Sequence, residues 1–378
     1  MKAAVEAVQP DCRIVVNSIG DAGARMVGVL KQVLPQSEAR LAALLYQAPS
    51  ELIGGLTCEQ AEKINTLLCT TGLDSQVLHK GQRFTPGAPD YEVALAIKSG
   101  ANLPAIAHQI MELLGVKADK ARAILCSSPT VLMGSVSANT VAALQRRFEP
   151  LGVELDVSQP AIATFDLFLG DCPPREAERV KQLVRDVKLP LLEAQDGTPQ
   201  PLLAVGLSKV QADRLWDQLR RTSLPARLVN RDFERFDVRL DAAPSAAPQS
   251  QALAEYLVAT TGMPERLAPK VLAKTPVVIQ QNIPFAAMAA HLDAITARGG
   301  RASGHLLAFQ VFAVAMDKVG DPTATAQLLQ VLGGLSPQEA LAAVGPAHPT
   351  VGAMTNPQAR WLQQELKRVG SEGRVILQ

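Results

Sequence analysis

The chain has 378 residues, of which 47% are hydrophobic, 19% charged and 4% aromatic. This composition excludes a disordered or fibrous chain, and the length predicts two or more domains because it exceeds what one hydrophobic core usually serves. The 37 Lys and Arg residues nearly balance the 36 Asp and Glu residues. No overall field therefore attracts nucleic acid or anionic lipid, and the scarcity of aromatic residues argues against a base-stacking surface.

One pattern recurs five times, with a period of about 70–80 residues. A strand that opens with an aromatic and a polar residue begins at Tyr91, Phe165, Phe236 and Phe309, and a degenerate first copy begins at Cys12. A helix start follows each opening, at the N-cap residues Thr57, Ser137, Ser208, Asn282 and Asn356. Short closing strands are predicted at 75–78, 153–157, 226–229, 302–307 and 374–377, of which the fourth is the weakest.

In chain order, each repeat reads strand, helix, helix, short strand, helix, strand. The helix pair is clearest at 103–114 and 117–126, and a proline follows the pair in every copy: Pro49, Pro129, Pro201, Pro276 and Pro349. This order predicts an α+β fold of five tandem β-α-α-β-α-β repeats, each a three-stranded sheet with helices on one face. The predicted repeats are 1–81, 90–160, 161–232, 233–306 and 307–378, with an enlarged flexible loop at 241–251 in the fourth.

The second repeat resembles a known domain. The motifs that carry the resemblance are DYEVALAIKSGAN at 90–102, LLGVKADKAR at 113–122, SSP at 127–129 and LGVELDV at 151–157. They look like the C-terminal domain of the bacterial ribosomal stalk protein L-seven/L-twelve, whose fold is shared with the Clp protease adaptor. The resemblance implies a non-enzymatic docking domain. In the stalk family basic residues of the first helix pair contact translational GTPases, but here those positions hold Leu103, His108 and Met111, and only Lys117 and Lys120 remain.

The cysteines and the apolar stretches of the sequence indicate in which cellular compartment the protein is expected. The five cysteines are odd in number and form no Cys-x-x-Cys pair, so the sequence predicts neither a disulfide framework nor a zinc site. Residues 1–10 lack the apolar core of a secretory signal, and the longest apolar stretch, 306–316, is about half the length that crosses a bilayer. These features predict a cytoplasmic protein with no membrane partner.

No pattern of catalytic or cofactor-binding residues stands out. The turn from Gly20 to Gly23 lacks a complete phosphate-binding motif and is interpreted as a structural turn. The histidines, at 79, 108, 291, 305 and 348, are not at metal-ligand spacing with Cys or Asp. Cys69 and Cys126 lie on helical stripes where packing is the expected role, although a Cys/His nucleophilic pair stays open as an alternative. The sequence therefore predicts no enzyme, no metal and no cofactor.

Two surfaces are candidates for binding a partner. On the predicted helix 103–114, Pro104, Ala107 and Met111 form an uncharged flank beside the apolar stripe, which suits burial against a neighbouring repeat. Seven arginines lie between 214 and 239, at 214, 220, 221, 227, 231, 235 and 239, but interleaved acidic residues cancel much of their field. The residues that we expect to contact a partner are Pro104, Ala107, His108, Met111, Arg220, Arg221, Arg227 and Arg231.

These features favour a protein-binding scaffold or adaptor, because repetition multiplies surface whereas catalysis needs one convergent set of residues. The identity of the protein partner does not follow from the sequence. The alternative is a nucleic-acid or ribosome-associated factor that uses the arginines of the third repeat.

Overall fold

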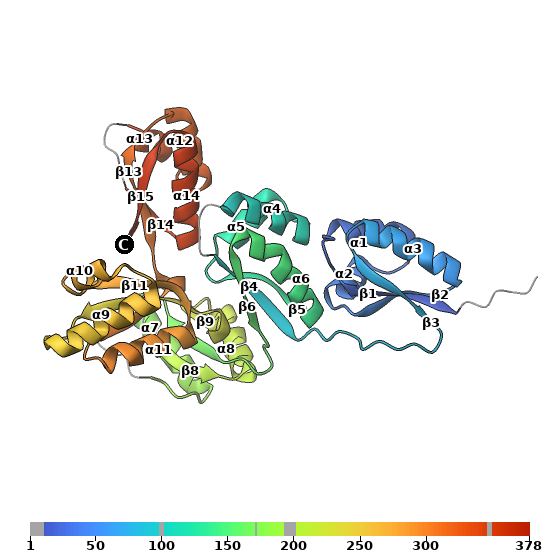
Figure 1. The fold of residues 1–378 in the computed structure, drawn as a ribbon, viewed down its shortest axis with the longest axis horizontal. Coiled ribbons are helices and arrows are strands. Elements are labelled where there is room, and N and C mark those ends of the chain that lie inside the picture. Colours follow the sequence, from blue (N-terminus) through green and yellow to red (C-terminus); the bar gives the residue numbers. More distant parts are fainter. Residues whose placement is uncertain (1–10, 98–101, 171, 193–201, 346–349) are drawn as a thin grey trace, which may run out of the picture. The chain divides into compact units, whose positions relative to one another are not determined.

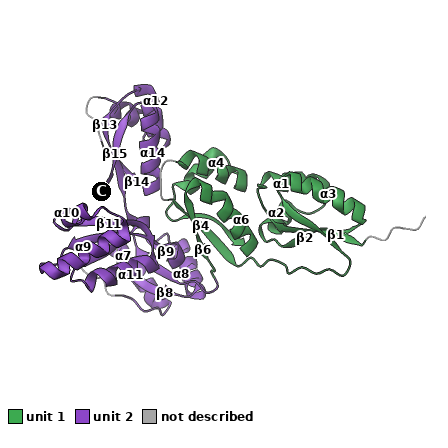
Figure 2. Cartoon of the chain, in the orientation of Figure 1, with its two compact units in different colours: residues 1–160 green, residues 161–378 purple. Residues whose placement is uncertain are grey.

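The computed structural model describes residues 11–97, 102–170, 172–192, 202–345 and 350–378. The chain divides after Pro160 into two compact units, shown in green and purple in Figure 2. The described residues form five separate three-stranded antiparallel sheets, two in the first compact unit and three in the second. The prediction of an α+β chain of five repeats is thereby confirmed (Figure 1).

The first compact unit contains two repeats. The first comprises β1 (Cys12–Ser18), α1 (Arg25–Val33), α2 (Glu38–Tyr46), β2 (Ser50–Leu56), α3 (Cys58–Thr70) and β3 (Asp74–His79). The second comprises β4 (Tyr91–Ile97), α4 (Leu103–Leu114), α5 (Ala118–Leu125), β5 (Thr130–Val136), α6 (Ala138–Phe148), the 3-10 turn η2 (Glu149–Leu151) and β6 (Val153–Ser158).

The second compact unit contains three repeats. The third repeat comprises β7 (Phe165–Leu169), α7 (Pro174–Asp186), β8 (Leu202–Leu207), α8 (Lys209–Thr222), β9 (Ala226–Asn230) and η3 (Arg231–Phe233). The fourth comprises β10 (Arg235–Ala242), α9 (Ala247–Thr261), η4 (Glu265–Leu267), α10 (Ala268–Leu272), β11 (Val277–Pro284), α11 (Phe285–Thr296), β12 (Arg301–Leu306) and η5 (Leu307–Phe309). The fifth comprises β13 (Phe312–Lys318), α12 (Pro322–Val331), α13 (Pro337–Ala343), β14 (Thr350–Met354), α14 (Asn356–Arg368) and β15 (Glu372–Leu377).

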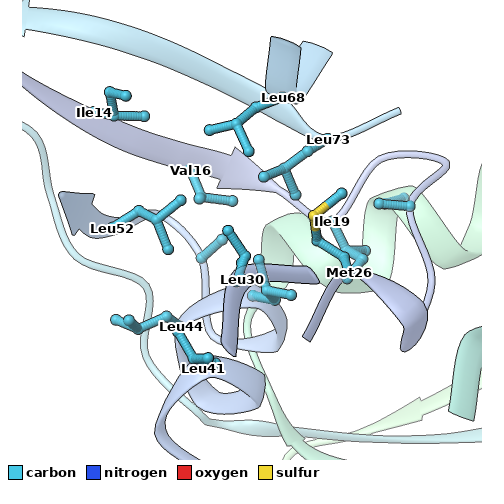
Figure 3. Packing of buried hydrophobic residues seen from close by; sticks show 14 of the residues in the cluster. Ile14, Val16, Ile19, Met26, Leu30, Leu41, Leu44, Leu52, Leu68 and Leu73 are labelled. Atoms are coloured by element: carbon cyan, nitrogen blue, oxygen red, sulfur yellow. The ribbon is translucent and has the colours of Figure 1, made fainter. Parts of the chain in front are cut away.

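All five sheets share one strand order, in which the first strand of the repeat lies between the other two, as in β2-β1-β3. The central strand pairs on both edges and is covered by helices, which explains its apolar sequence. In the first repeat Ile14 and Val16 from β1 pack with Met26, Leu30 and Leu44 from the helices (Figure 3). Each repeat therefore folds around its own first strand.

A β-bulge recurs in the second strand of every sheet. Its residue with positive φ is Gly55, Ser135, Gly206, Asn282 or Ala353, and the ladder with the central strand shifts register beside it. In the third and fourth repeats the acidic residue after the opening phenylalanine fixes this bulge. The Asp166 carboxylate accepts the Gly206 N–H at 2.8 Å, and Asp237 accepts the Asn282 N–H at 3.0 Å. The aromatic–polar pair thus has a structural role there.

In three repeats the observed N-cap residue is the one predicted from the sequence. Thr57, Ser137 and Ser208 each accept a backbone N–H from the first turn, and Thr57 and Ser208 form complete capping boxes. Two predicted caps are wrong. Asn282 occupies the bulge, so that α11 begins after Pro284, and the fifth cap is Thr355, one residue before Asn356.

Three other predictions need correction. The fifth repeat opens at Phe312, because Phe309 belongs to the turn η5. Between β7 and β8 the described residues contain one helix, α7, where two were expected. The expected flexible loop 241–251 is mostly regular, since β10 continues to Ala242 and α9 begins at Ala247. Of the two prolines of this segment, Pro244 lies between β10 and α9, and Pro248 lies in the first turn of α9, where a missing N–H is tolerated.

The predicted closing strands, and three of the five prolines, can be matched to elements of the structure. The predicted closing strands, including the weak fourth one, correspond to β3, β6, β9, β12 and β15. Pro49, Pro129 and Pro276 each precede the second strand of their sheet and follow a cis peptide bond. Pro201 and Pro349 lie outside the described residues.

The two repeats of the first compact unit pack against each other. The Ser137 N–H and the Thr140 hydroxyl both donate to the Tyr46 carbonyl, at 3.1 and 2.8 Å, and the Tyr46 hydroxyl donates to the Leu113 carbonyl at 2.5 Å. Ala143 of α6 joins the hydrophobic core of the first repeat. Because these groups are buried or half-buried, the two repeats form one packed body, as expected for neighbouring repeats.

Candidate functional site

Helix α8 of the third repeat presents an unusual exposed surface. Its cap and its buried stripe, Ala212, Leu215 and Leu219, hold one face against the sheet of the repeat. Trp216 lies beside this stripe and is 44% exposed, whereas Val210 lies on the opposite face and is 60% exposed. Tryptophan side chains are highly buried on average in folded proteins. An exposed tryptophan on a helix that is fixed by its own buried stripe therefore marks a candidate binding surface.

Three arginines lie on the exposed faces of this helix. Arg220 lies one turn after Trp216 on the same side of the helix, whereas the exposed Arg214 and Arg221 lie with Val210 on the face away from the buried stripe. In the part of the chain that the structure describes, none of these three arginines forms an ion pair, whereas Lys209 pairs with Asp213. We call Val210, Arg214, Trp216, Arg220 and Arg221 the α8 surface. Its chemistry combines an apolar anchor with positive charge.

The other arginines of the predicted cluster have internal partners. Arg227 donates to the Ala308 carbonyl at 2.9 Å and lies over the Phe309 ring, 5.1 Å from its centre. Arg231 binds both carboxylate oxygens of Asp166, at 3.0 and 2.6 Å, and also packs on an aromatic ring. These two predicted partner-binding residues therefore serve contacts within the second compact unit, whereas Arg220 and Arg221 stay exposed.

A buried carboxyl group lies beside the Asp166–Arg231 pair. Glu234 is only 2% exposed, and its Oε1 atom has no hydrogen-bond partner. Burial, reinforced by the negative charge of Asp166, raises the pKa of Glu234 to about 8, although Arg231 opposes the shift. The group is therefore protonated in the folded chain at neutral pH. It lies in the interior of the unit, so we interpret it as part of the packing and not of a binding surface.

The predicted flank of α4 is less accessible than the α8 surface. Ala107 is buried, Pro104 and Met111 are half-buried, and His108 is exposed with its Nε2 3.4 Å from a carboxylate oxygen of Glu112. The last turn of this helix contacts the first repeat, where the Glu112 carbonyl accepts the Ala24 N–H at 3.0 Å. One end of α4 is therefore occupied by the neighbouring repeat.

The turn from Gly20 to Gly23 is structural, as expected. The N–H groups of Asp21 and Ala22 donate to the Gly72 carbonyl, at 2.9 and 3.3 Å. A Cβ atom at Gly20, whose φ is +54°, would lie 2.4 Å from the same carbonyl oxygen. These amides are used within the repeat and do not form a phosphate cradle.

Two cysteines and a histidine meet at one corner of the first sheet, contrary to the sequence prediction. Cys12 begins β1, Cys58 begins α3 and His79 ends β3. The cysteines form a disulfide with a Cα–Cα distance of 5.1 Å, and His79 Nδ1 lies 3.3 Å from Cys12 Sγ and 3.5 Å from Cys58 Sγ. We call these three residues the Cys–Cys–His corner. The odd cysteine count and the long separations along the chain hid this arrangement.

Of the two cysteines that were expected to pack, Cys126 is partly buried but Cys69 is exposed, so the expectation is wrong for Cys69. Cys126 lies at the end of α5, and burial raises the pKa of its thiol to about 11, which disfavours the reactive thiolate. Cys172 is half-buried and Cys69 is exposed. These positions do not support the alternative of a thiolate nucleophile at Cys126.

Comparisons with known proteins give no further guide. No protein-family model, curated protein or solved structure matches the chain. The likeness of the second repeat to the ribosomal stalk domain stays a prediction. Within the described residues, no helix combines the length and apolarity that crossing a bilayer requires.

Proposed function

We propose that the chain is a non-catalytic scaffold that binds a protein partner through the α8 surface. The observation that carries the proposal is Trp216, an exposed tryptophan with Arg220 one turn away, on a helix whose own apolar stripe is already packed. Tryptophan and arginine are the side chains that most often dominate the affinity of protein interfaces. The repeated fold supports the same function, because each repeat adds exposed helix without a convergent set of reactive groups.

The chemistry of the surface defines the partner. Trp216 offers a large apolar side chain that loses little conformational freedom on binding, so it fits a preformed apolar pocket. Arg220 is the positive charge one turn from Trp216, and on the exposed faces of the whole helix Arg214, Arg220 and Arg221 outnumber the one unpaired acid, Asp217. The α8 surface therefore favours carboxylates. The proposed partner is therefore a protein with an apolar pocket bordered by Asp or Glu residues.

Affinity capture from native lysate with the full chain tests this function. Trp216→Ala combined with Arg220→Ala should abolish capture of a protein that the wild-type chain retains. The matched control is Leu341→Ala combined with Arg301→Ala, which removes an exposed apolar residue and an exposed arginine from the fifth and fourth repeats. Equal capture by both double variants would contradict the proposal.

The salt dependence separates this function from nucleic-acid binding. A complex anchored by Trp216 should survive moderate salt, because apolar contacts do not depend on counterion release. If nuclease treatment or a rise from about 50 to 200 mM salt removed everything that the chain retains, the nucleic-acid alternative would replace the scaffold. The pairing of Arg227 and Arg231 within the chain already leaves fewer arginines for phosphate contacts.

A further inference from the structure

The Cys–Cys–His corner is set by the sheet, and its position recurs in every repeat. Cys12 lies opposite His79 in the ladder of β1 and β3, and opposite Leu56 in the ladder of β1 and β2. Cys58 follows Leu56 by two residues and is the first residue of α3. The strand opening, the helix start and the end of the closing strand thus meet at one point.

The other repeats show that the fold does not need cysteine or histidine there. In the fourth repeat the equivalent residues are Phe236, opposite Ile283 and Leu306, and Phe285, the first residue of α11. The two rings pack edge to face, with their centres 6.0 Å apart. The strand-opening residue is aromatic in the second, third and fifth repeats too: Tyr91, Phe165 and Phe312. Only the first repeat, among the five described corners, has metal-ligating side chains at this opening and helix start.

The three side chains have the chemistry of a site for a soft metal ion. Their ligand atoms lie within 4.8 Å of one another. In the disulfide form the distances from Nδ1 to the two sulfurs, 3.3 and 3.5 Å, are close to the roughly 3.5 Å between nitrogen and sulfur ligands of a tetrahedral zinc ion, and reduction would let the two sulfurs separate around an ion. Cys58 is at the N-terminus of a 13-residue helix, whose dipole favours the thiolate. His79 is exposed, so an ion has a path to the site.

We propose that the Cys–Cys–His corner is a thiol-gated site for a zinc-class metal ion. A dithiol reductant supplies two electrons and two protons that break the Cys12–Cys58 bond, and the reductant itself becomes a disulfide. The ion then displaces the two thiol protons and forms bonds to both sulfurs and to Nδ1 of His79, whose proton is on Nε2. Water takes the fourth position, as in zinc sites with three protein ligands. Oxidation by a disulfide restores the S–S bond and releases the ion.

Cobalt(II) titration of the full chain tests the site, because thiolate ligands give Co²⁺ a charge-transfer absorption band. The reduced wild-type chain should bind one Co²⁺ with this band, lose it when Zn²⁺ is added, and show no band when oxidised. His79→Ala should weaken Co²⁺ binding at least about tenfold, since even residues that only orient ligands contribute about 10–100-fold. Circular dichroism checks that this exposed substitution preserves the fold. The matched control, Cys69→Ser, alters an exposed cysteine outside the corner and should bind like the wild type.

Results of three kinds would overturn the proposal. The first is a reduced chain that shows no thiolate band, which would leave the corner a disulfide alone. The second is equal Co²⁺ affinity of the His79→Ala and wild-type chains. The third is equal binding by the oxidised chain, or loss of the band in Cys69→Ser, either of which would place the ion elsewhere. Capture of the protein partner is scored separately and does not bear on this test.

Discussion

Ser137 should contribute more to stability than an ordinary helix cap. Its hydroxyl accepts the Thr140 N–H at the start of α6 and also donates to the Ala48 carbonyl of the first repeat. Both Ser137 and Ala48 are buried. Ser137→Ala therefore loses a cap, worth about 0.5–2 kcal/mol. It also leaves a buried carbonyl unpaired, at a cost of about 1–3 kcal/mol.

The matched substitution is Ser208→Ala. Ser208 caps α8 with a complete capping box, but it is exposed and its side-chain hydrogen bonds are with Gln211 of the same helix. We expect a loss of roughly 2–4 kcal/mol for Ser137→Ala and about 0.5–2 kcal/mol for Ser208→Ala. The difference measures the contact between the first two repeats.

The two tryptophans allow the compact units to be followed separately. Trp216 and Trp361 both lie in the second compact unit, so fluorescence during urea unfolding reports that unit alone. Ser208→Ala should shift the fluorescence transition, and Ser137→Ala should leave it unchanged. Hydrogen exchange should show faster exchange in both the first and second repeats of Ser137→Ala. Equal losses for the two variants, or faster exchange confined to the second repeat, would refute this reasoning.

Three further predictions concern pH, thiol reactivity and fluorescence. Because the folded chain raises the pKa of Glu234 to about 8, above the value of about 4.3 in an unfolded chain, the folded state keeps a proton that the unfolded state has released. Stability should therefore fall by up to about 1.4 kcal/mol per pH unit between about pH 5 and 8, and Glu234→Gln should flatten the dependence of the urea midpoint on pH. Iodoacetamide at about pH 8 should label the exposed Cys69 well before Cys126, whose buried thiol has a pKa of about 11; mass spectrometry that found the reverse order would reject the packing role of Cys126. Acrylamide should quench Trp216 more than Trp361, which is partly buried and packs against the core of the fifth repeat, as the single variants Trp216→Phe and Trp361→Phe would show.

The sequence predicted the repeated elements because their signals are local. A cap such as Ser208, with Gln211 three residues later, acts within one turn of helix and can be read without the fold. Asn282 misled the assignment because asparagine is favoured both as an N-cap and at positive φ, and only pairing with β10 decides between them. Phe309 and Phe312 both suit a strand opening, so the turn η5 could not be recognised from local preference.

The candidate sites depended on contacts that local patterns do not contain. The acidic residues near the arginines indicated that much of the positive field of the cluster is cancelled. They did not indicate which arginine forms an ion pair, because Arg231 pairs with Asp166, 65 residues away along the chain. The Cys–Cys–His corner needs the strand order, which places the first strand at the centre of the sheet. Given that order, Cys12 at a strand opening and Cys58 after the cap Thr57 are recognisable signals.

Photo-crosslinking at position 216 tests the proposed scaffold most directly. The full chain carrying benzoylphenylalanine in place of Trp216 keeps an aromatic side chain on the α8 surface, and Glu62 on the exposed face of α3 is the control position. In native lysate, irradiation should join position 216 to one predominant protein, through a peptide that contains Asp or Glu beside apolar residues, and Arg220→Glu should reduce the yield. Crosslinks to nucleic acid alone would contradict the proposed scaffold. So would crosslinks from position 62 to the same proteins as from position 216.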